Sequence, residues 1–224
     1  MNKKTFYLCI EGTDGSGKTT LVKKLLEYFE SKNLSVLLTK EFGSTHDYFC
    51  SEARKLALSS NSNLDDKAGQ AIWGPIIVQH QEKVIKPNMG KFDIILSDRG
   101  PYSNYCYGPE HSQRKGFKKF IKNFFDLIYQ DAQKPNVSIF LNIPVEVATK
   151  RRLARNPENF GNNGVDRVEA KGEKFQEKVK ANFVKMSKIK KDLKVLKITE
   201  SMNEESVLQE ALNILRKNPK FPKI

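Results

Sequence analysis

Long apolar segments and paired cysteines are both missing from this 224-residue sequence. It has no uninterrupted apolar run of about 18 residues, the length that a membrane-spanning helix needs. Its three cysteines, Cys9, Cys50 and Cys106, lie far apart without a CxxC pair, which excludes a disulfide framework and a cysteine zinc site. The first residues pass from charged to strand-like too quickly for a signal peptide. We therefore expect a cytoplasmic protein with reduced thiols and no membrane partner.

The sequence is also poor in acidic residues: 26 Asp and Glu stand against 39 Lys and Arg, which gives a formal net charge of +13. The basic residues are spread along the chain, a distribution that favours solvated helix faces. An anionic small substrate and DNA are the two alternatives that this charge leaves open.

Glycine and proline, at 13 and 9 residues, are too few for a collagen-like or disordered chain. The length suits one α/β domain, so we expect a single domain over residues 1–224.

Short apolar, β-branched runs alternate with longer segments of helical spacing. We expect strands at Phe6 to Ile10, Val36 to Thr39, Phe92 to Ser97, Val137 to Ile143 and Val195 to Thr199, with the second and last nearest the sheet edges. We expect helices at Lys18 to Ser31, Asp47 to Leu58, Asp65 to Ile85, Phe117 to Asp131, Val145 to Arg155, Glu169 to Lys190 and Glu204 to Lys217, the third kinked by Gly74-Pro75. This alternation predicts an α/β fold, a parallel sheet covered by helices on both faces.

The strongest motif directly follows the first of these strands. Its residues Gly12, Gly17, Lys18 and Thr19 match GxxxxGK[ST] between a strand and a helix, the context that phosphate binding requires. Glycines let backbone N–H groups converge on phosphate oxygens, the lysine bridges the β and γ phosphates, and the threonine hydroxyl ligates Mg²⁺. The sequence therefore predicts a site for a nucleoside triphosphate.

Asp98 and Arg99 form a second candidate site at the end of the apolar run FDIILSD. A parallel strand delivers residues at its carboxyl end to the ligand-binding crevice. There, Asp98 can support Mg²⁺, and Arg99 can bind a second phosphate, such as that of an acceptor nucleotide. The alternatives are a turn-forming aspartate before Gly100-Pro101 and a surface salt bridge.

Six segments, in this order, resemble the thymidylate kinase family of nucleoside monophosphate kinases. EGTDGSGKTT resembles the family's EGxDGxGKTT, LLTKEFGST its TREPGGT, EARKLAL its LRxLLL, EKVIKP its xxVIKP, DRGPYSNYCYG its DRYxxSxxAYxG, and DRVE its lid exit DRxE. The resemblance runs from Phe6 to about Met186. It implies a P-loop NTPase fold with a five-stranded parallel sheet and an arginine-bearing lid at about 151–168. It also implies transfer of the γ-phosphoryl group of ATP to dTMP, giving dTDP, by a homodimer.

The resemblance assigns roles to individual residues. The implied ATP-binding residues are Gly12, Thr13, Asp14, Gly15, Ser16, Gly17, Lys18, Thr19, Thr20 and Arg151, the last of them near the adenine. The implied acceptor-binding residues are Asp14, Phe42, Arg54, Trp73, Arg99, Ser103, Asn104 and Tyr107. Among these, Asp14 is implied near the sugar 3′-hydroxyl, Arg99 on the acceptor phosphate, and Tyr107 against the 2′ position of a ribonucleotide. Trp73 takes the place of a stacking Phe, with a core anchor as the alternative. The implied metal ligands are Thr19 and Asp98.

Phosphoryl transfer needs cations that close over the transferring group. The glycine-rich loop has no arginine at its variable positions, so the chain resembles the family branch whose catalytic arginine lies in the lid. Arg155 is the first candidate and Arg152 the second, beside Lys18 and Arg99. Arg167 and Glu169 are candidates for locking the far end of the lid.

Ile77 stands where the family usually has an arginine that reads thymine O4, so the acceptor base stays open. Gln70 or Gln81 could substitute, and dUMP, a 5-substituted dUMP or several deoxynucleotides are alternative acceptors. Two other functions stay open as well. A deoxynucleoside kinase is opposed by Arg99 and DRVE, and a DNA-dependent P-loop ATPase is motivated only by the net charge. We expect no nucleic-acid partner, because no helix-turn-helix, zinc-finger or aromatic RNP pattern is present.

Overall fold

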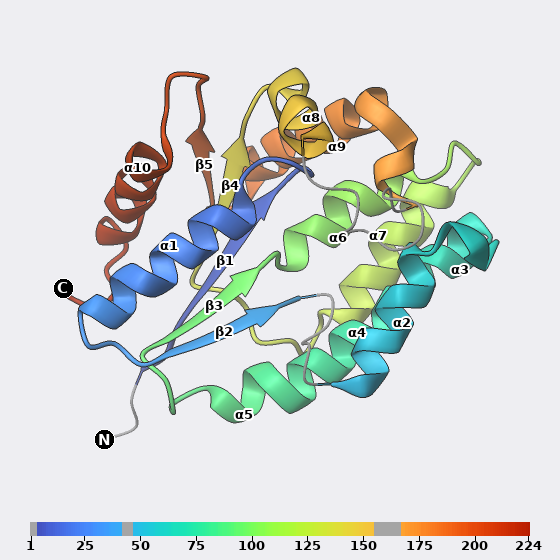
Figure 1. The fold of residues 1–224 in the computed structure, drawn as a ribbon. Helices are drawn as coiled ribbons and strands as arrows, with labels where there is room; N and C mark the ends of the chain where they lie inside the picture. Colours follow the sequence, from blue (N-terminus) through green and yellow to red (C-terminus); the bar gives the residue numbers. More distant parts are fainter. Residues whose placement is uncertain (1–3, 42–46, 155–166) are drawn as a thin grey trace.

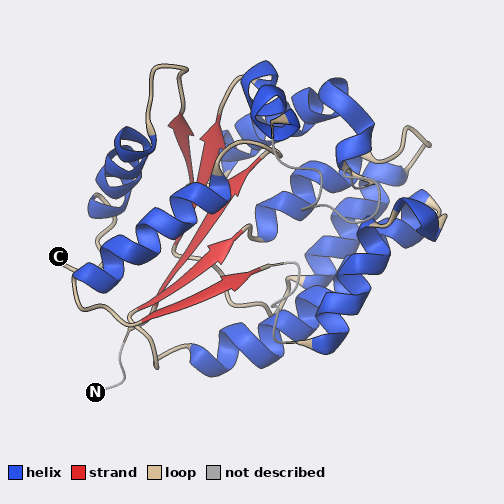
Figure 2. Cartoon of the chain, viewed as in Figure 1, coloured by secondary structure: helices blue, strands red, loops and turns tan. Residues whose placement is uncertain are grey.

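The computed structural model describes the chain except for residues 1–3, 42–46 and 155–166, and its centre is a five-stranded parallel sheet (Figures 1 and 2). The strands are β1 Phe6–Gly12, β2 Val36–Lys40, β3 Ile94–Asp98, β4 Val137–Asn142 and β5 Leu193–Lys197. Their order is β2-β3-β1-β4-β5, and every neighbouring pair is parallel. The predicted parallel sheet is therefore confirmed, with the second and fifth strands at its edges as expected.

The helices surround this sheet. They are α1 Lys18–Ser31, α2 Tyr48–Leu58, α3 Asp66–Ala71, α4 Trp73–His80, α5 Lys86–Asn88, α6 Pro101–Tyr107, α7 Phe117–Ile128, α8 Val145–Leu153, α9 Gly172–Ile189 and α10 Glu204–Arg216. Short 3₁₀ turns lie at Ser60–Ser62, Gly108–Glu110 and Glu169–Lys171, and a π-helical turn at Gln81–Ile85 joins α4 to α5. Among the described residues, none of these helices is both long and apolar enough to cross a membrane.

Two helical segments differ from the sequence predictions. The single helix expected over 65–85 is interrupted at Ile72, between α3 and α4. Pro75 explains the position of this break, because it lacks the N–H that would bond the carbonyl of Ala71 one turn earlier. The sequence analysis also missed α6, which begins at Pro101 directly after β3. Proline is well suited to the first turn of a helix, where an N–H has no partner in the helix.

Side-chain alternation along β1 divides the core into two layers. Phe6, Leu8 and Ile10 pack on one side with leucines of α1 and α10. Tyr7 and Cys9 point to the other side, toward an isoleucine of β3. Figure 1 shows α1 and α10 over the first face, and α6 and α9 over the second, with α2, α4 and α7 beyond them. The sheet is thus buried on both faces, which explains the continuous apolar runs of its central strands.

The parallel arrangement brings the chemically important segments together at the carboxyl ends of the strands. Asp98 at the end of β3 is in register with Ile10 of β1 and with Lys40 at the end of β2. The loop after β1 and the helix after β3 therefore start side by side. Ligand sites in open α/β sheets lie in the crevice at the carboxyl ends of the strands.

Candidate active site

The loop between β1 and α1 depends on glycines at two positions. Gly15 and Gly17 have φ angles of 82° and 90°, in the left-handed region that glycine tolerates best. A Cβ on Gly15 would lie 2.1 Å from the carbonyl oxygen of Ala148, so the approach of α8 to the loop also requires glycine there. Lys18, the first residue of α1, donates from Nζ to the carbonyl of Thr13 at 2.8 Å.

A cavity of about 620 Å³, which we call the loop cavity, opens above this loop. It is lined by Asp14, Gly15, Ser16, Gly17, Lys18, Thr19, Thr20, Leu21, Lys40, Arg54, Asp98, Arg99, Arg151, Ile198, Met202, Asn203, Glu204 and Val207. Basic side chains outnumber acidic ones, which favours a polyanion, and Ile198, Met202 and Val207 supply an apolar end. Gly12 and Thr13 are not among the described residues that line it.

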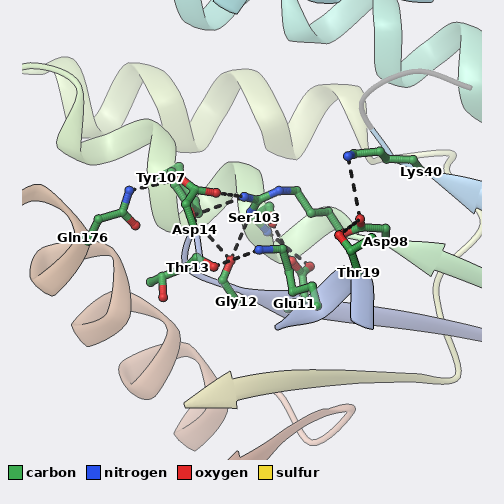
Figure 3. A network of polar contacts seen from close by, with 12 residues as sticks. Glu11, Gly12, Thr13, Asp14, Thr19, Lys40, Asp98, Ser103, Tyr107 and Gln176 are labelled. Atoms are coloured by element: carbon green, nitrogen blue, oxygen red, sulfur yellow. Dashed lines mark hydrogen bonds and ion pairs between the residues drawn. The ribbon is translucent and has the colours of Figure 1, made fainter. Parts of the chain in front are cut away.

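Arg99 donates hydrogen bonds to four residues, Gly12, Asp14, Ser103 and Tyr107, which are labelled in Figure 3. Its Nη1 atom donates to the Gly12 carbonyl at 3.1 Å and to Ser103 Oγ at 3.2 Å. Its Nη2 atom donates to Asp14 Oδ1 and, at 3.4 Å, to the Tyr107 hydroxyl. Burial alone lowers the pKa of this guanidinium, but Tyr107 and Asp14 outweigh that effect, and the pKa lies above its ordinary value. Arg99 therefore carries its charge in a low-dielectric position.

Thr19 and Asp98 lie together at the mouth of the loop. Thr19 Oγ1 donates to Asp98 Oδ2 at 3.2 Å, and Lys40 Nζ lies 3.7 Å from the same oxygen (Figure 3). Burial raises the pKa of Asp98, but the charges of Lys18 and Lys40 lower it by more than burial raises it. The pKa of Asp98 therefore lies below its ordinary value. The second carboxylate oxygen, Oδ1, is buried and has no hydrogen-bond partner in the described part of the chain. An ionised carboxylate with an unused oxygen beside a hydroxyl suits a hard cation such as Mg²⁺.

A second cavity, of about 90 Å³, lies on the other side of Arg99, and we call it the Trp73 cavity. Its lining residues are Asp14, Arg54, Leu58, Gln70, Trp73, Arg99, Ser103, Asn104, Tyr107, His111 and Val168. All of the predicted acceptor-binding residues that the structure describes are in this set, while Phe42 lies outside the described residues. The two cavities share Asp14, Arg54 and Arg99. These three side chains form the junction between them.

The positions considered for reading the base lie in different surroundings. Ile77 is fully buried in the apolar cluster of α2, α4 and α7, so it does not reach the Trp73 cavity. Of the two glutamines considered as substitutes, Gln70 lines the cavity. Gln81 instead accepts a hydrogen bond from the backbone N–H of Gln133 at 3.0 Å. His111, which the sequence analysis did not consider, also lines the cavity, and burial lowers its pKa to about 3, so the ring is neutral.

The lid candidates lie at different places. Arg151 lines the loop cavity, and its Nη1 atom lies 3.9 Å from the position of a Cβ on Gly17. Arg152, also on α8, is half-buried and is not among the described residues that line either cavity. Arg155 lies outside the described residues. Arg167, just after the residues that are not described, donates from Nη2 to the carbonyl of Leu64 at 3.2 Å.

Besides His111, the sequence analysis missed further polar residues at this site, among them Lys40, Gln176 and Glu11. Lys40 lines the loop cavity, and its place at the carboxyl end of a parallel strand was a usable signal. Gln176 donates from Nε2 to Asp14 Oδ2 at 3.1 Å, across 162 residues of sequence that carry no local signal. Glu11 is fully buried and accepts from the Ser103 hydroxyl at 2.5 Å. Burial, only partly offset by Ser103 and Arg99, raises the pKa of Glu11 to about 7.

Comparison with known proteins places this geometry in a family. The model of the thymidylate kinase family matches residues 10–210. A probable thymidylate kinase of Pyrococcus abyssi is 29% identical over 204 residues, covering 89% of this chain and 91% of that protein. The thymidylate kinase of Thermosipho africanus is 27% identical and covers 95% and 98%. The thymidylate kinase structure from Candida albicans shares the fold, with a TM-score of 0.74 at 20% identity, over 98% of this chain and 94% of that one.

These matches confirm three predictions from the sequence: the P-loop NTPase fold, ATP as the phosphate donor, and kinase activity that converts dTMP to dTDP. Because the family model spans residues 10–210, the chain belongs to the thymidylate kinase family.

Proposed function

We propose that ATP binds in the loop cavity, that dTMP binds in the Trp73 cavity, and that the γ-phosphoryl group passes between them at the junction of Asp14, Arg54 and Arg99. The observation that carries this proposal is that two cavities meet at these three side chains. Phosphoryl transfer needs the attacking oxygen, the phosphorus and the leaving oxygen in line, and it needs the negative charge of the transferred group neutralised, with little covalent chemistry from the protein. A buried guanidinium between the donor and acceptor sites would hold the acceptor phosphate in position and neutralise that charge.

On the donor side, the backbone of the glycine-rich loop and the Lys18 ammonium would hold the phosphates. The apolar end of the loop cavity, with Arg151 nearby, would hold the adenine. Thr19 Oγ1 and Asp98 would hold Mg²⁺, which when bound neutralises phosphate charge. Arg155, with Arg152 second, stays our proposal for the lid cation, in a lid of about 151–168 that belongs to one domain over residues 1–224.

On the acceptor side, Arg99 would bind the phosphate of dTMP, and the indole of Trp73 would stack on the pyrimidine. Asp14 would approach the 3′-hydroxyl, and Tyr107 would crowd the 2′ position. Asn104 would face the edge of the base, since it lines the same cavity. We also propose a cytoplasmic location, which agrees with three buried cysteines that form no disulfide.

A panel of acceptors tests this function directly. Purified protein with ATP and Mg²⁺ is incubated with dTMP, dUMP, dCMP, dGMP or thymidine, and products are separated by ion-exchange chromatography. We expect dTDP from dTMP and no dTMP from thymidine. Diphosphate formation from none of the monophosphates would contradict the proposal, and phosphorylation of thymidine in preference to dTMP would favour a deoxynucleoside kinase. DNA added without an acceptor should not stimulate ATP hydrolysis.

ATP affinity should fall at alkaline pH because of Lys18. Burial, followed by the Arg99 charge, lowers the pKa of Lys18 to about 8. Without bound nucleotide, Lys18 is therefore a charged ammonium below about pH 8 and a neutral amine above it. Binding of the phosphates favours the charged form, so it becomes weaker as the pH rises above this value. We expect the Kd for a non-hydrolysable ATP analogue, measured by calorimetry, to rise about tenfold from about pH 7 to about pH 9. Lys18→Arg, which stays charged over this range, should show a flat profile. A flat profile in the wild type would contradict the prediction.

We propose a homodimer formed through α2, α4 and α7. These helices expose large apolar side chains, including Tyr48 at 83% and Phe49 at 46%. Between them runs an open groove of about 590 Å³ lined by Phe49, Ala71, Pro75, Val78, Gln79, Phe124 and Ile128. Contiguous apolar surface of this kind marks protein interfaces.

Light scattering should give about twice the chain mass of 25.6 kDa. The double variant Phe49→Asp/Val78→Asp should be monomeric, because it places two charges in the groove. Ile189→Asp, at an exposed apolar position on α9, is the control and should stay dimeric. A monomeric wild-type protein at micromolar concentration would rule the dimer out.

A further inference from the structure

A buried chain of hydrogen bonds runs from the wall of the Trp73 cavity into the protein interior. Asn104 of α6 donates from Nδ2 to the hydroxyl of Tyr129 at 2.5 Å. That hydroxyl donates to Oε1 of Glu41 at 2.8 Å. All three side chains are buried, but only Asn104 lines the cavity. Tyr129 and Glu41 can therefore act on a ligand in this cavity only through Asn104.

The inner end of this chain is anchored. Glu41 follows β2 and is fully buried, and its Oε2 atom lies 3.4 Å from Nδ1 of His80. On the opposite side of the imidazole, Nε2 lies 2.7 Å from Oγ1 of Thr39. The carboxylate thus lies between α4 and the end of α7, with Oε1 accepting from Tyr129 and Oε2 beside the imidazole but without a hydrogen bond in the described part of the chain. Because the side chain is fully buried among these groups, its movement is restricted.

The direction of each hydrogen bond follows from the single proton of the Tyr129 hydroxyl. The Tyr129 hydroxyl has a single proton, and it donates that proton to the carboxylate oxygen Oε1 of Glu41. Burial and the neighbouring Glu41 raise the pKa of Tyr129 well above its ordinary value, so the hydroxyl keeps that proton. The phenolic oxygen can then only accept from Asn104, which leaves the amide nitrogen as its partner. Asn104 Oδ1 takes no part in this chain.

The orientation of this carboxamide decides what a pyrimidine meets. If the carboxamide were free to rotate by about 180°, its oxygen and its nitrogen would exchange places, so the same point would offer either an acceptor or a donor. Such an asparagine would not distinguish thymine from cytosine. Thymine and uracil carry a proton on N3, whereas cytosine has a lone pair there. No arginine supplies the discrimination from α4, since Ile77 is in the core. Fixing the orientation of this one amide would therefore let a single side chain distinguish these bases.

We propose that Glu41 and Tyr129 are positioning residues that hold the Asn104 carboxamide with Oδ1 toward the bound base, and so select pyrimidines with a proton on N3 over cytosine. The inference rests on the proposed function, which puts the acceptor base in the Trp73 cavity. The choice of acceptor base then depends on the carboxylate of Glu41, which does not line the cavity that would hold the nucleotide. With the chain of hydrogen bonds reversed, Asn104 would offer only N–H groups, which suit the cytosine N3.

The test compares dTMP, dUMP and dCMP as acceptors for the wild type, Tyr129→Phe and Glu41→Gln. The wild type should prefer dTMP and dUMP to dCMP. In Tyr129→Phe the ratio of kcat/KM for dTMP to that for dCMP should fall about tenfold, the effect of losing one hydrogen bond. The change should lie in KM, with kcat for dTMP near the wild-type value. Glu41→Gln should move the ratio in the same direction, because its amide can donate to Tyr129.

Tyr105→Phe is a matched control. Its hydroxyl donates to Asp126 at 3.1 Å, on the surface and away from the cavity, so the ratio should not change. An equal loss of kcat/KM for all three acceptors in Tyr129→Phe would mean a merely structural role and would overturn the inference. A wild type that uses dCMP as well as dTMP would overturn it even where the variants do not fold. If the wild type phosphorylates no monophosphate, the proposed function itself fails, which is a distinct result.

Discussion

Lys18→Ala is expected to lower kcat by about a thousandfold, the scale of losing a preorganised charge at the transferring group. The ammonium is buried at the first turn of α1, where water screens it little, and it is held across the glycine-rich loop by the Thr13 carbonyl. Alanine leaves the backbone N–H groups in place, so some nucleotide binding should remain. Steady-state dTDP formation with saturating ATP and dTMP measures the loss.

Lys23→Ala provides the control for this variant. Lys23 lies on the same helix but is exposed, and it pairs with Glu27 only at 3.9 Å on the surface. A surface pair of this kind contributes little, so both kcat and stability should stay close to wild type. If Lys18→Ala retained more than about a tenth of the wild-type kcat, the assignment of Lys18 to the transferring phosphates would be wrong.

The parts of the site that were predictable from the sequence are those with a local signal. The loop from Gly12 to Thr19 is a contiguous motif between a strand and a helix, and the helix after it has the predicted bounds, Lys18–Ser31. Asp98 and Arg99 could be found because a buried strand ends there, at the edge where parallel sheets bind ligands. The resemblance to a family then supplied the acceptor residues, seven of which line one cavity.

The remaining parts depend on contacts between distant segments. The seven residues of α6 are too few to show a helical period, and they begin with a proline. The bond between Gln176 and Asp14 and the chain through Glu41, Tyr129 and Asn104 each join residues far apart in the sequence. No spacing rule connects such positions, because they meet only when the sheet and its covering helices are assembled.

Arg99 has a backbone conformation that points to function. Its φ angle is 71°, in the left-handed region, which costs a residue with a side chain of the order of 1 kcal/mol or more. Strain at such a position persists only when surrounding contacts overcome it, and the guanidinium contacts β1, the glycine-rich loop and α6. The backbone turn aims this side chain at the junction of the two cavities instead of along the strand.

Arg99→Lys is therefore expected to lower kcat/KM for dTMP by about a hundredfold, although the charge is kept. A lysine has one nitrogen in place of the planar fork, so it cannot contact Gly12, Asp14 and a phosphate at once. Both KM for dTMP and kcat should change, because the fork would act on the acceptor phosphate in the ground state and in the transition state. Affinity for the ATP analogue should change by less than about threefold, since Lys18 and the loop amides hold that ligand.

Arg114→Lys is the matched control for this exchange, because Arg114 pairs with Asp65 in an exposed position, at 2.7 Å. It should leave kcat/KM unchanged. A loss of twofold or less in Arg99→Lys would mean that charge alone, without the fork, is sufficient at the junction. Equal weakening of ATP analogue and dTMP binding would instead place Arg99 in support of the loop, because its bond to the Gly12 carbonyl would then be the contact that matters.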